Sequence, residues 1–526
     1  MSPLLRISMG ALLALAVTLA WYLRSPRRRD RRGRTLVSNA HASRAARAHS
    51  GSITWGGHRL PRGAETTHFL VAGTTGSGKS LTLNLLMREA LSGAARGSDA
   101  RALIYDPKTE VASALASLNL DLPVIYLNPF DARSAEWDMA SDVTSPVTAL
   151  QVASIFIPEE KGSTNRYFSD TARDLLAELM MSFVASGSPW TLRDVVLGMR
   201  SPDRLRDVLG ATSRGEELYK MHAADPRAFH NVLSTARSRL APFEPVAALW
   251  ARAGSKVSLR DWASGEMVLV LGNDDSARTA MDALNRVLFQ RASELALRRP
   301  NSKTRRTWFF LDEVREAGTL DGLSRLMTKG RSRGCCVALG FQDIHGLKSV
   351  YGPEVALEIV GQCSQKALLR MESDATAKWA SATIGQYEQV DVLRGESGSL
   401  DRSFQRSASE QWRTADVVLP SEFLAIPPTG SSTGLTGYYL TPHLGAFRRT
   451  TPLSALVGPS EGSPPVIDLA ERPESDQYLE PWTIQDGIRL ALSREAILRM
   501  DEEREAVLEA ESPGRLQSSL SWEEAA

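Results

Sequence analysis

Short apolar runs alternate with helix-like segments along most of this chain. Apolar runs of about four to eight residues, bounded by turn-forming residues, are typical of strands that are buried on both faces of a parallel sheet. Such runs occupy residues 69–72, 102–106, 124–127, 267–271, 307–311, 335–341 and 366–371. Residues 285–297 carry helical periodicity between two of these runs. The pattern predicts an α/β fold with a parallel sheet.

The strand signal disappears between residues 146 and 250. Ala172, Leu175, Leu179 and Phe183 recur at intervals of three or four, which places them on one side of a helix. Residues 191–194 read Thr-Leu-Arg-Asp, which is typical of a capping box at a helix start. We therefore expect an all-α domain inserted within the α/β domain.

The N-terminal region contains a separate apolar segment. Residues 7–23 carry no charge, end near Trp21 and Tyr22, and are followed by the arginine cluster at 24–34. The segment is short for a membrane span, but interfacial aromatics and flanking arginines are typical of one. A cleaved signal peptide is the alternative, although it carries its positive charge before the apolar core. We expect a single anchor helix in a membrane, with the rest of the chain in the cytoplasm.

The overall charge conceals a strong asymmetry between the two ends. The 526 residues carry a net charge of +1, while residues 1–47 carry +9 and residues 456–526 carry −10. Contacts with nucleic acid must therefore come from local Arg and Lys placement. The acidic tail either docks a partner or is merely solvated. The three cysteines suit neither a disulfide framework nor a metal site, which fits a reduced cytosolic compartment.

The most informative chemistry follows the first apolar run. Residues 73–80 match G-x-x-x-x-G-K-[ST], the loop that binds phosphates, and an uninterrupted helix pattern follows them. Lys79 would reach the β and γ phosphates of a nucleotide, and the Ser80 hydroxyl would bind Mg²⁺. A chance match in a turn would not explain the strand before and the helix after. The candidate nucleotide-binding residues are Gly73, Thr74, Thr75, Gly76, Ser77, Gly78, Lys79 and Ser80.

Two acidic residues and one glutamine follow later apolar runs that we expect to be strands. The run 307–311 leads into Asp312 and Glu313, which is the Walker B pattern. Asp312 would hold Mg²⁺ through water, and Glu313 would polarise the attacking water. Gln342, after the run 335–341, would sense the γ-phosphate or position water, or else be an ordinary strand-terminal amide.

Other polar residues keep two interpretations open. Arg331, or Arg333 beside it, could reach the γ-phosphate in a neighbouring subunit, and Arg370 is a second candidate; the alternative is a solvated turn. Asp106 and Asn128, at the ends of two strands, either contact nucleotide or cap turns. The chain contains no Asn-Lys-x-Asp motif for guanine, so we expect ATP as the nucleotide.

These motifs together resemble the type IV secretion coupling proteins, the TraD/TrwB-like DNA-pumping ATPases of bacterial conjugation. The resemblance covers roughly residues 60–440. Besides the phosphate loop and Walker B strand, the segments that carry it are 65–68 (Glu-Thr-Thr-His), 106–108 (Asp-Pro-Lys), 128–137, 330–334 and 340–343.

The resemblance implies a membrane-anchored hexameric ring that uses ATP and Mg²⁺ to move DNA. It further implies a RecA-like P-loop NTPase domain, an all-α domain facing the cytoplasm, and delivery of a relaxase–DNA complex to the secretion channel. By motif, Gln342 matches a family glutamine and Arg331 a ring-interface arginine. Such proteins usually have two transmembrane helices, whereas this sequence shows one candidate.

These expectations divide the chain into six parts. They are a transmembrane anchor (1–25), a basic linker (26–50), the first part of the RecA-like ATPase domain (51–145), the inserted all-α domain (146–250), the second part of the ATPase domain (251–455) and an acidic tail (456–526).

Two other functions remain open at this point. One is a related ring ATPase that pumps DNA outside conjugation. The other is a nucleotide-controlled membrane docking protein whose acidic tail recruits a secreted partner. The Asp312–Glu313 pair argues against a switch that does not hydrolyse nucleotide.

Overall fold

The computed structural model describes most of the chain and leaves out the expected membrane anchor. The described residues are 32–118, 120–160, 163–399, 403–456 and 470–500. The apolar segment at 7–23 and the arginine cluster up to residue 31 lie outside them. No helix within the described residues is long and apolar enough to cross a membrane.

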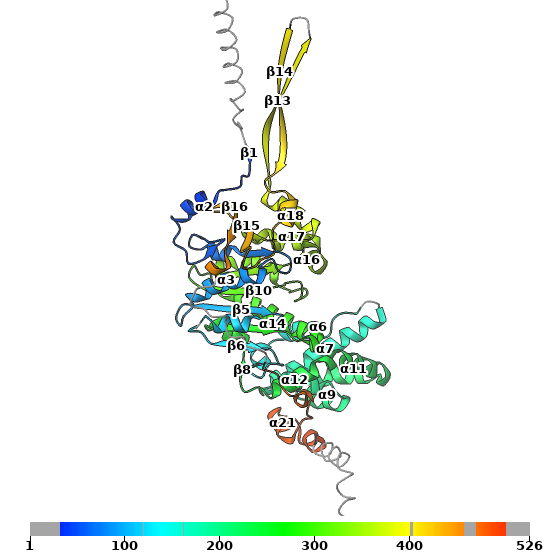
Figure 1. The fold of residues 1–526 in the computed structure, drawn as a ribbon. Helices are drawn as coiled ribbons and strands as arrows, with labels where there is room; N and C mark the ends of the chain where they lie inside the picture. The colour runs from blue at the N-terminus through cyan, green and yellow to red at the C-terminus, as the bar shows by residue number, and fades with distance from the viewer. Residues whose placement is uncertain (1–31, 119, 161–162, 400–402, 457–469, 501–526) are drawn as a thin grey trace, which may run out of the picture.

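A sheet of nine strands forms the centre of the described part of the chain (Figure 1). Seven of its strands are parallel, and β15 and β16 extend it as an antiparallel hairpin at one edge. From edge to edge the order is β16 (Gly445–Thr451), β15 (Leu435–Thr441), β12 (Gln365–Leu368), β4 (Phe69–Ala72), β11 (Cys335–Phe341), β10 (Arg306–Leu311), β5 (Ala100–Asp106), β9 (Val268–Gly272) and β6 (Val124–Leu127).

Both faces of the central strands of this sheet are buried, which explains why these strands read as continuous apolar runs. In β4, Phe69 and Val71 pack into one hydrophobic core, while Leu70 and Ala72 pack into the other. This alternation is the two-residue period of a strand. Helices α3 (Lys79–Ser92) and α4 (Val111–Ala116) contribute to the first core. The second core contains residues of α14 (Arg278–Arg298), α15 (Leu323–Lys329), α16 (Ile344–Tyr351), α17 (Pro353–Gln362) and α18 (Asp374–Ile384).

A block of helices lies between β6 and β9 in the sequence and packs beside the sheet (Figure 1). Its buried side chains belong to the same hydrophobic cluster as the second core, so the two parts share packing. Its helices are α5 (Met139–Asp142), α6 (Pro146–Phe156), α7 (Ser163–Ser186), α8 (Leu192–Gly198), α9 (Pro202–Leu209), α10 (Ser213–Ala223), α11 (Pro226–Leu240), α12 (Glu244–Ala251) and α13 (Leu259–Ser264). The short strands β7 (Glu136–Trp137) and β8 (Lys256–Val257) pair at its base.

The structure contains several short helices and strands that the apolar pattern of the sequence did not predict. Part of the expected basic linker forms helix α2 (Asn39–Ala46), because the Ser38 hydroxyl caps its N-terminus and Ala42 and Ala46 pack into the core. A small hairpin, β2 (Thr54–Trp55) with β3 (His58–Arg59), follows. Helices α19 (Pro420–Leu424) and α20 (Leu453–Leu456) flank the β15–β16 hairpin in the sequence.

A long hairpin projects from the end of the molecule that carries α17 and α18 (Figure 1). It consists of β13 (Gln386–Ser399) and β14 (Ser403–Asp416). The short strand β1 (Arg32–Gly33) pairs with the base of β13. This hairpin places the first described residues of the chain at the same end of the molecule.

Residues 470–500 of the expected acidic tail pack against the helical block. The segment contains the short 3₁₀ helix η5 (Glu474–Gln477) and the α-helix α21 (Ile484–Arg489). Trp482 is buried, and its indole N–H donates to Asp194 at 2.9 Å. Arg489 donates to both carboxylate oxygens of Asp194, at 2.9 and 2.8 Å. This part of the tail is therefore built into the folded molecule rather than solvated as a free chain.

Candidate active site

The strand order brings the predicted motifs to one edge of the sheet. Strand β11 lies between β4 and β10, and these strands are parallel. Their carboxyl ends therefore meet at the same edge, which is where ligands bind in open α/β sheets. The phosphate loop follows β4, Asp312 and Glu313 follow β10, and Gln342 follows β11.

The loop after β4 turns sharply before α3 begins at Lys79. Gly76 and Gly78 have φ angles of +73° and +88°, a left-handed conformation that favours glycine. A Cβ at Gly78 would also lie 2.8 Å from the Thr429 hydroxyl oxygen, and one at Gly73 would lie 2.5 Å from the Ser77 hydroxyl oxygen. The loop therefore needs glycine at these positions, and it leads directly to a helix N-terminus that attracts anions.

Asp312 connects the loop to strand β10. Its two oxygens accept hydrogen bonds from Lys79 Nζ at 2.9 Å and from the Ser80 hydroxyl at 2.7 Å. Two oxygen donors in this arrangement fit Mg²⁺, which usually takes one or two protein ligands and completes its shell with phosphate and water. No group of three or more His, Cys, Asp or Glu suited to a metal occurs among the described residues.

Lys79 is buried between two acids. Its side chain is 5% exposed and forms ion pairs with Asp312 and Glu313. Burial alone would lower the pKa of Lys79, but the attraction of both carboxylates outweighs burial and raises the pKa above its ordinary value. Lys79 is therefore held as a cation at the place where phosphate charge would arrive.

Glu313 is held in a fixed orientation. It is 4% exposed and has a φ of 56°, a left-handed conformation that is uncommon for a residue with a side chain. The Gln342 amide donates to a Glu313 carboxylate oxygen at 2.9 Å, and the Thr75 hydroxyl donates to the Gln342 oxygen at 3.4 Å. A chain of polar groups thus joins the loop, Gln342 and Glu313.

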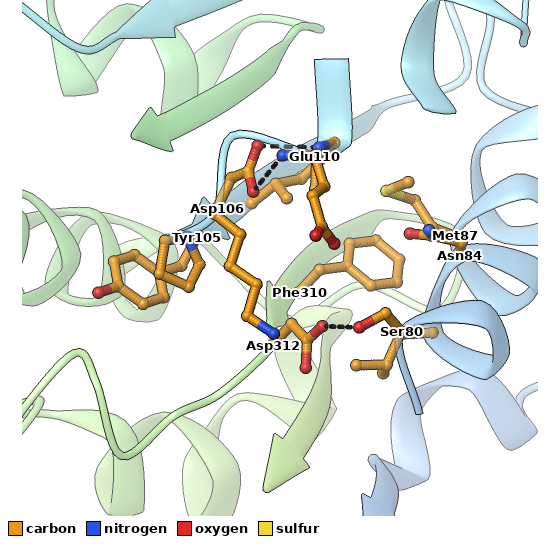
Figure 2. Close-up of a pocket in the computed structure, with 13 residues that line it drawn as sticks. Ser80, Asn84, Met87, Tyr105, Asp106, Glu110, Phe310 and Asp312 are labelled. Carbon is orange, nitrogen blue, oxygen red and sulfur yellow. Dashed lines mark hydrogen bonds between the residues drawn. The ribbon is translucent and has the colours of Figure 1, made fainter. Parts of the chain in front are cut away.

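A pocket opens beside this cluster (Figure 2). Ser80, Asp312, Tyr105 and Asp106 are among the residues that line it. Asp106 accepts hydrogen bonds from the backbone N–H groups of residues 110 and 111, at 3.1 and 2.9 Å, so it caps α4 as well as lining the pocket. Burial raises the pKa of Asp106 to about 6, and the backbone N–H groups offset this only in part.

The second strand-end residue lies away from the site. Asn128 follows β6, which is the outermost strand on one side of the sheet. Strands β5 and β9 separate β6 from β10. Its side-chain oxygen accepts from the Phe130 N–H at 3.3 Å, so it caps a turn. Between the two interpretations of Asn128, the geometry favours capping.

The candidate arginines lie in two different places. Arg370 follows β12 beside the phosphate loop, where its carbonyl accepts from the Thr74 N–H at 2.9 Å and its guanidinium pairs with Glu372 at 2.7 Å. Arg331 and Arg333 lie in η4 (Arg331–Arg333), which precedes β11. They therefore lie at the amino ends of the parallel strands, on the opposite edge of the sheet from the phosphate loop. A strand of seven residues separates the two edges by roughly 20 Å.

Two residues contact the phosphate loop without any sequence signal, and a third residue, His68, lies in a segment of the family resemblance but had no role assigned to it. Glu372 accepts from the Thr74 hydroxyl at 3.2 Å, and Thr429 donates to the carbonyls of Gly76 and Ser77. His68 accepts from the Val337 N–H at 3.1 Å. Glu372 and Thr429 lie about 300 or more residues from the loop they contact, so no local motif could have identified them.

Comparison with known proteins gives a consistent family. The model of the type IV secretion-system coupling protein DNA-binding domain matches residues 52–440. The coupling protein TraD of Escherichia coli K12 is 24% identical over 351 residues, which is 65% of this chain and 47% of that protein. The conjugal transfer protein TraG of Rhizobium radiobacter is 25% identical over 350 residues, which is 61% of this chain and 54% of that protein. The chain thus matches about half the length of these curated relatives.

Solved structures share the fold. The unbound conjugative coupling protein TrwB, in a truncated form, has a TM-score of 0.62 and 24% identity, covering 80% of this chain and 92% of that chain. TrwB in complex with ADP and Mg²⁺ also has a TM-score of 0.62, with 23% identity, covering 86% of this chain and 97% of that chain. The predicted fold class is confirmed in its coarser form: an α/β RecA-like core with a helical domain.

Proposed function

Because the chain belongs to the family of type IV secretion-system coupling proteins, we propose that it is an ATPase that drives DNA into a type IV secretion channel during conjugation. The observation that carries this proposal is the cluster of Lys79, Ser80, Asp312 and Glu313 at one edge of the sheet. A DNA-binding domain by itself needs neither a buried lysine nor an acid beside it. A machine that hydrolyses nucleoside triphosphates needs both.

The loop and its two oxygen donors fit ATP and Mg²⁺. Backbone N–H groups of the loop and the α3 N-terminus would cradle the phosphates, while Lys79 would turn from its carboxylate partners toward the β and γ phosphates. Ser80 and Asp312 would hold Mg²⁺. When bound, Mg²⁺ supplies charge neutralisation for the phosphate oxygens.

Glu313 would accept a proton from the water that attacks the γ-phosphate. Departure of Lys79 toward the phosphates would release this carboxylate for that role, because the two are paired in the structure. Gln342 would keep Glu313 in place through its hydrogen bond of 2.9 Å. Thr75 connects Gln342 to the phosphate loop, so the position of the loop would affect the position of Glu313, the proposed general base.

The larger assembly is part of the same proposal. Residues 7–23 would anchor the protein in the bacterial inner membrane, with the ATPase domain in the cytoplasm. Copies of the chain would form a ring, most simply a hexamer, in which Arg331 and Arg333 face the nucleotide of a neighbour. A relaxase–DNA complex would be the substrate delivered to the channel. The opposite-edge position of the two arginines supports this arrangement, because they cannot serve the site of their own chain.

The test is ATP hydrolysis by the purified chain with and without DNA. We expect DNA to stimulate hydrolysis, and Lys79→Ala to lower the rate on the order of 100-fold or more, because a preorganised positive charge at the phosphates is lost. Phosphate release measures the rate.

Lys378→Ala is the matched control, because Lys378 is exposed and, among the described residues, pairs with an exposed acid of its own helix α18. It should leave the rate unchanged. Hydrolysis that is indifferent to both single- and double-stranded DNA would argue against translocation. Hydrolysis that survives Lys79→Ala would argue against the site itself.

A further inference from the structure

The tip of the phosphate loop is held from outside by one residue. Thr429 lies in the loop between α19 and β15. Its backbone N–H donates to the Gly76 carbonyl at 2.9 Å, and its hydroxyl donates to the Ser77 carbonyl at 2.8 Å. Two consecutive carbonyls of the phosphate loop are therefore bound by a single residue about 350 positions away.

Peptide geometry gives these two bonds a consequence inside the loop. In a planar trans peptide, the C=O of one residue and the N–H of the next point in opposite directions. Fixing the Ser77 carbonyl toward Thr429 therefore aims the Gly78 N–H toward the inside of the loop. Fixing the Gly76 carbonyl orients the Ser77 N–H in the same way, and this N–H donates to the Thr74 carbonyl across the loop at 3.1 Å.

Two further backbone attachments lie at the beginning of the loop. The Gly73 N–H donates to the Phe341 carbonyl at 3.2 Å, and the Thr74 N–H donates to the Arg370 carbonyl at 2.9 Å. These bonds tie the loop to the ends of β11 and β12 but leave its tip to Thr429. Gly76 and Gly78 are glycines with left-handed backbone, so the tip is also the part whose peptide planes rotate most easily.

The segment that carries Thr429 is itself stiff. Two prolines, at 427 and 428, precede Thr429 and limit its backbone freedom. The Thr433 hydroxyl donates to the Pro428 carbonyl at 2.6 Å, and the Gly434 N–H donates to the Gly430 carbonyl at 2.8 Å. Strand β15 begins directly after this turn, so the segment that carries Thr429 is attached to the sheet.

We propose that Thr429 is a positioning residue that sets the direction of the Gly78 N–H for phosphate binding. The inference rests on the proposed nucleotide function and adds to it the residue that preorganises the loop. Because the Gly78 N–H would contact phosphate in both the ground state and the transition state, Thr429 acts on nucleotide affinity more than on the chemical step.

The test compares two substitutions at one position. Thr429→Val keeps the shape and the backbone bond but removes the hydroxyl, whereas Thr429→Ser keeps the hydroxyl. The probe is ADP with Mg²⁺, titrated calorimetrically into the full-length chain. We expect Thr429→Val to raise the Kd for ADP about tenfold and Thr429→Ser to stay within about twofold of wild type. In ATP hydrolysis, Thr429→Val should raise KM with kcat nearly unchanged.

Thr436→Val is the matched control. Thr436 is buried in β15, and its hydroxyl bonds to Thr450 at 2.9 Å, so this variant also loses one hydrogen bond, in the strand that follows the Thr429 loop. It should leave the Kd for ADP unchanged. Wild-type affinity in Thr429→Val, or an equal loss in Thr429→Ser or Thr436→Val, overturns the inference alone. Absence of ADP binding by the wild-type chain overturns the proposed function, and the inference with it.

Discussion

His68 shows how one buried side chain fixes the approach to the phosphate-loop strand. It is 2% exposed and has a φ of 54°. Its Nδ1 accepts from the Val337 N–H at 3.1 Å, so the ring proton lies on Nε2, which donates to the Met327 carbonyl at 2.9 Å. The bond from Val337 requires a neutral imidazole, because Nδ1 can accept a hydrogen bond only while it is unprotonated. Burial, together with the charge of nearby Arg331, lowers the pKa of His68 to about 4, although the bond to Met327 acts in the opposite direction.

This depressed pKa predicts a pH dependence of stability. The folded pKa lies below the ordinary 6.5, so the stability that His68 provides is fully present above about pH 6.5 and is lost as the pH falls toward about 4. We expect the difference in unfolding midpoint between wild type and His68→Gln to shrink over this range, by the equivalent of about 3 kcal/mol. Thermal unfolding at several pH values measures it. His41→Gln, at an exposed position of α2, is the control, and a constant difference across the range would refute the prediction.

At the scale of elements, the sequence predicted the strands and the loop whose residue pattern is contained in one short stretch of the chain. Each parallel core strand is an apolar run, and the loop after β4 carries its chemistry in eight consecutive residues. The placement of β11 between β4 and β10 was not predictable, because strand order depends on packing between distant segments. Thr429 and His68 act through backbone groups far away in the sequence, and neither residue type signals such a role. The β13–β14 hairpin lacks the strict apolar alternation that marks a half-buried strand.

The packed part of the tail gives a prediction at this scale. Asp194 is fully buried and accepts from Arg489 and Trp482, so the tail segment supplies its only ionic partner among the described residues. Replacing Arg489 with Met should destabilise this contact by roughly 3 kcal/mol, because a buried carboxylate loses its counter-charge. Hydrogen exchange should then rise in residues 470–500 and in α8. Arg494→Met, at an exposed position of the same segment, is the control. Unchanged exchange in the Arg489 variant would contradict the prediction.

At the scale of the whole molecule, the sheet separates two sites that differ in their charged side chains. One edge holds the phosphate loop with Asp312 and Glu313. The other edge holds a large cavity whose charged lining is almost entirely basic. Its basic residues are Arg62, Lys303, Arg306, Lys329, Arg331 and Arg333, against the single acid Glu65. A chain whose two edges differ in this way suits head-to-tail contact, in which the nucleotide edge of one copy faces the basic edge of the next.

Mixing two inactive variants tests this head-to-tail arrangement. Lys79→Ala removes the nucleotide site but keeps Arg331, whereas Arg331→Ala keeps the site but removes the arginine. If Arg331 acts on a neighbour, each variant alone should be inactive, while a one-to-one mixture should recover up to roughly a quarter of the wild-type ATPase rate, because about one interface in four then has both groups. Recovery should depend on subunit exchange and disappear when each variant is cross-linked before mixing. Full activity of Arg331→Ala alone, or no recovery on mixing, would show that Arg331 does not act in trans. The roughly 20 Å between η4 and the phosphate loop of the same chain makes recovery the expected result.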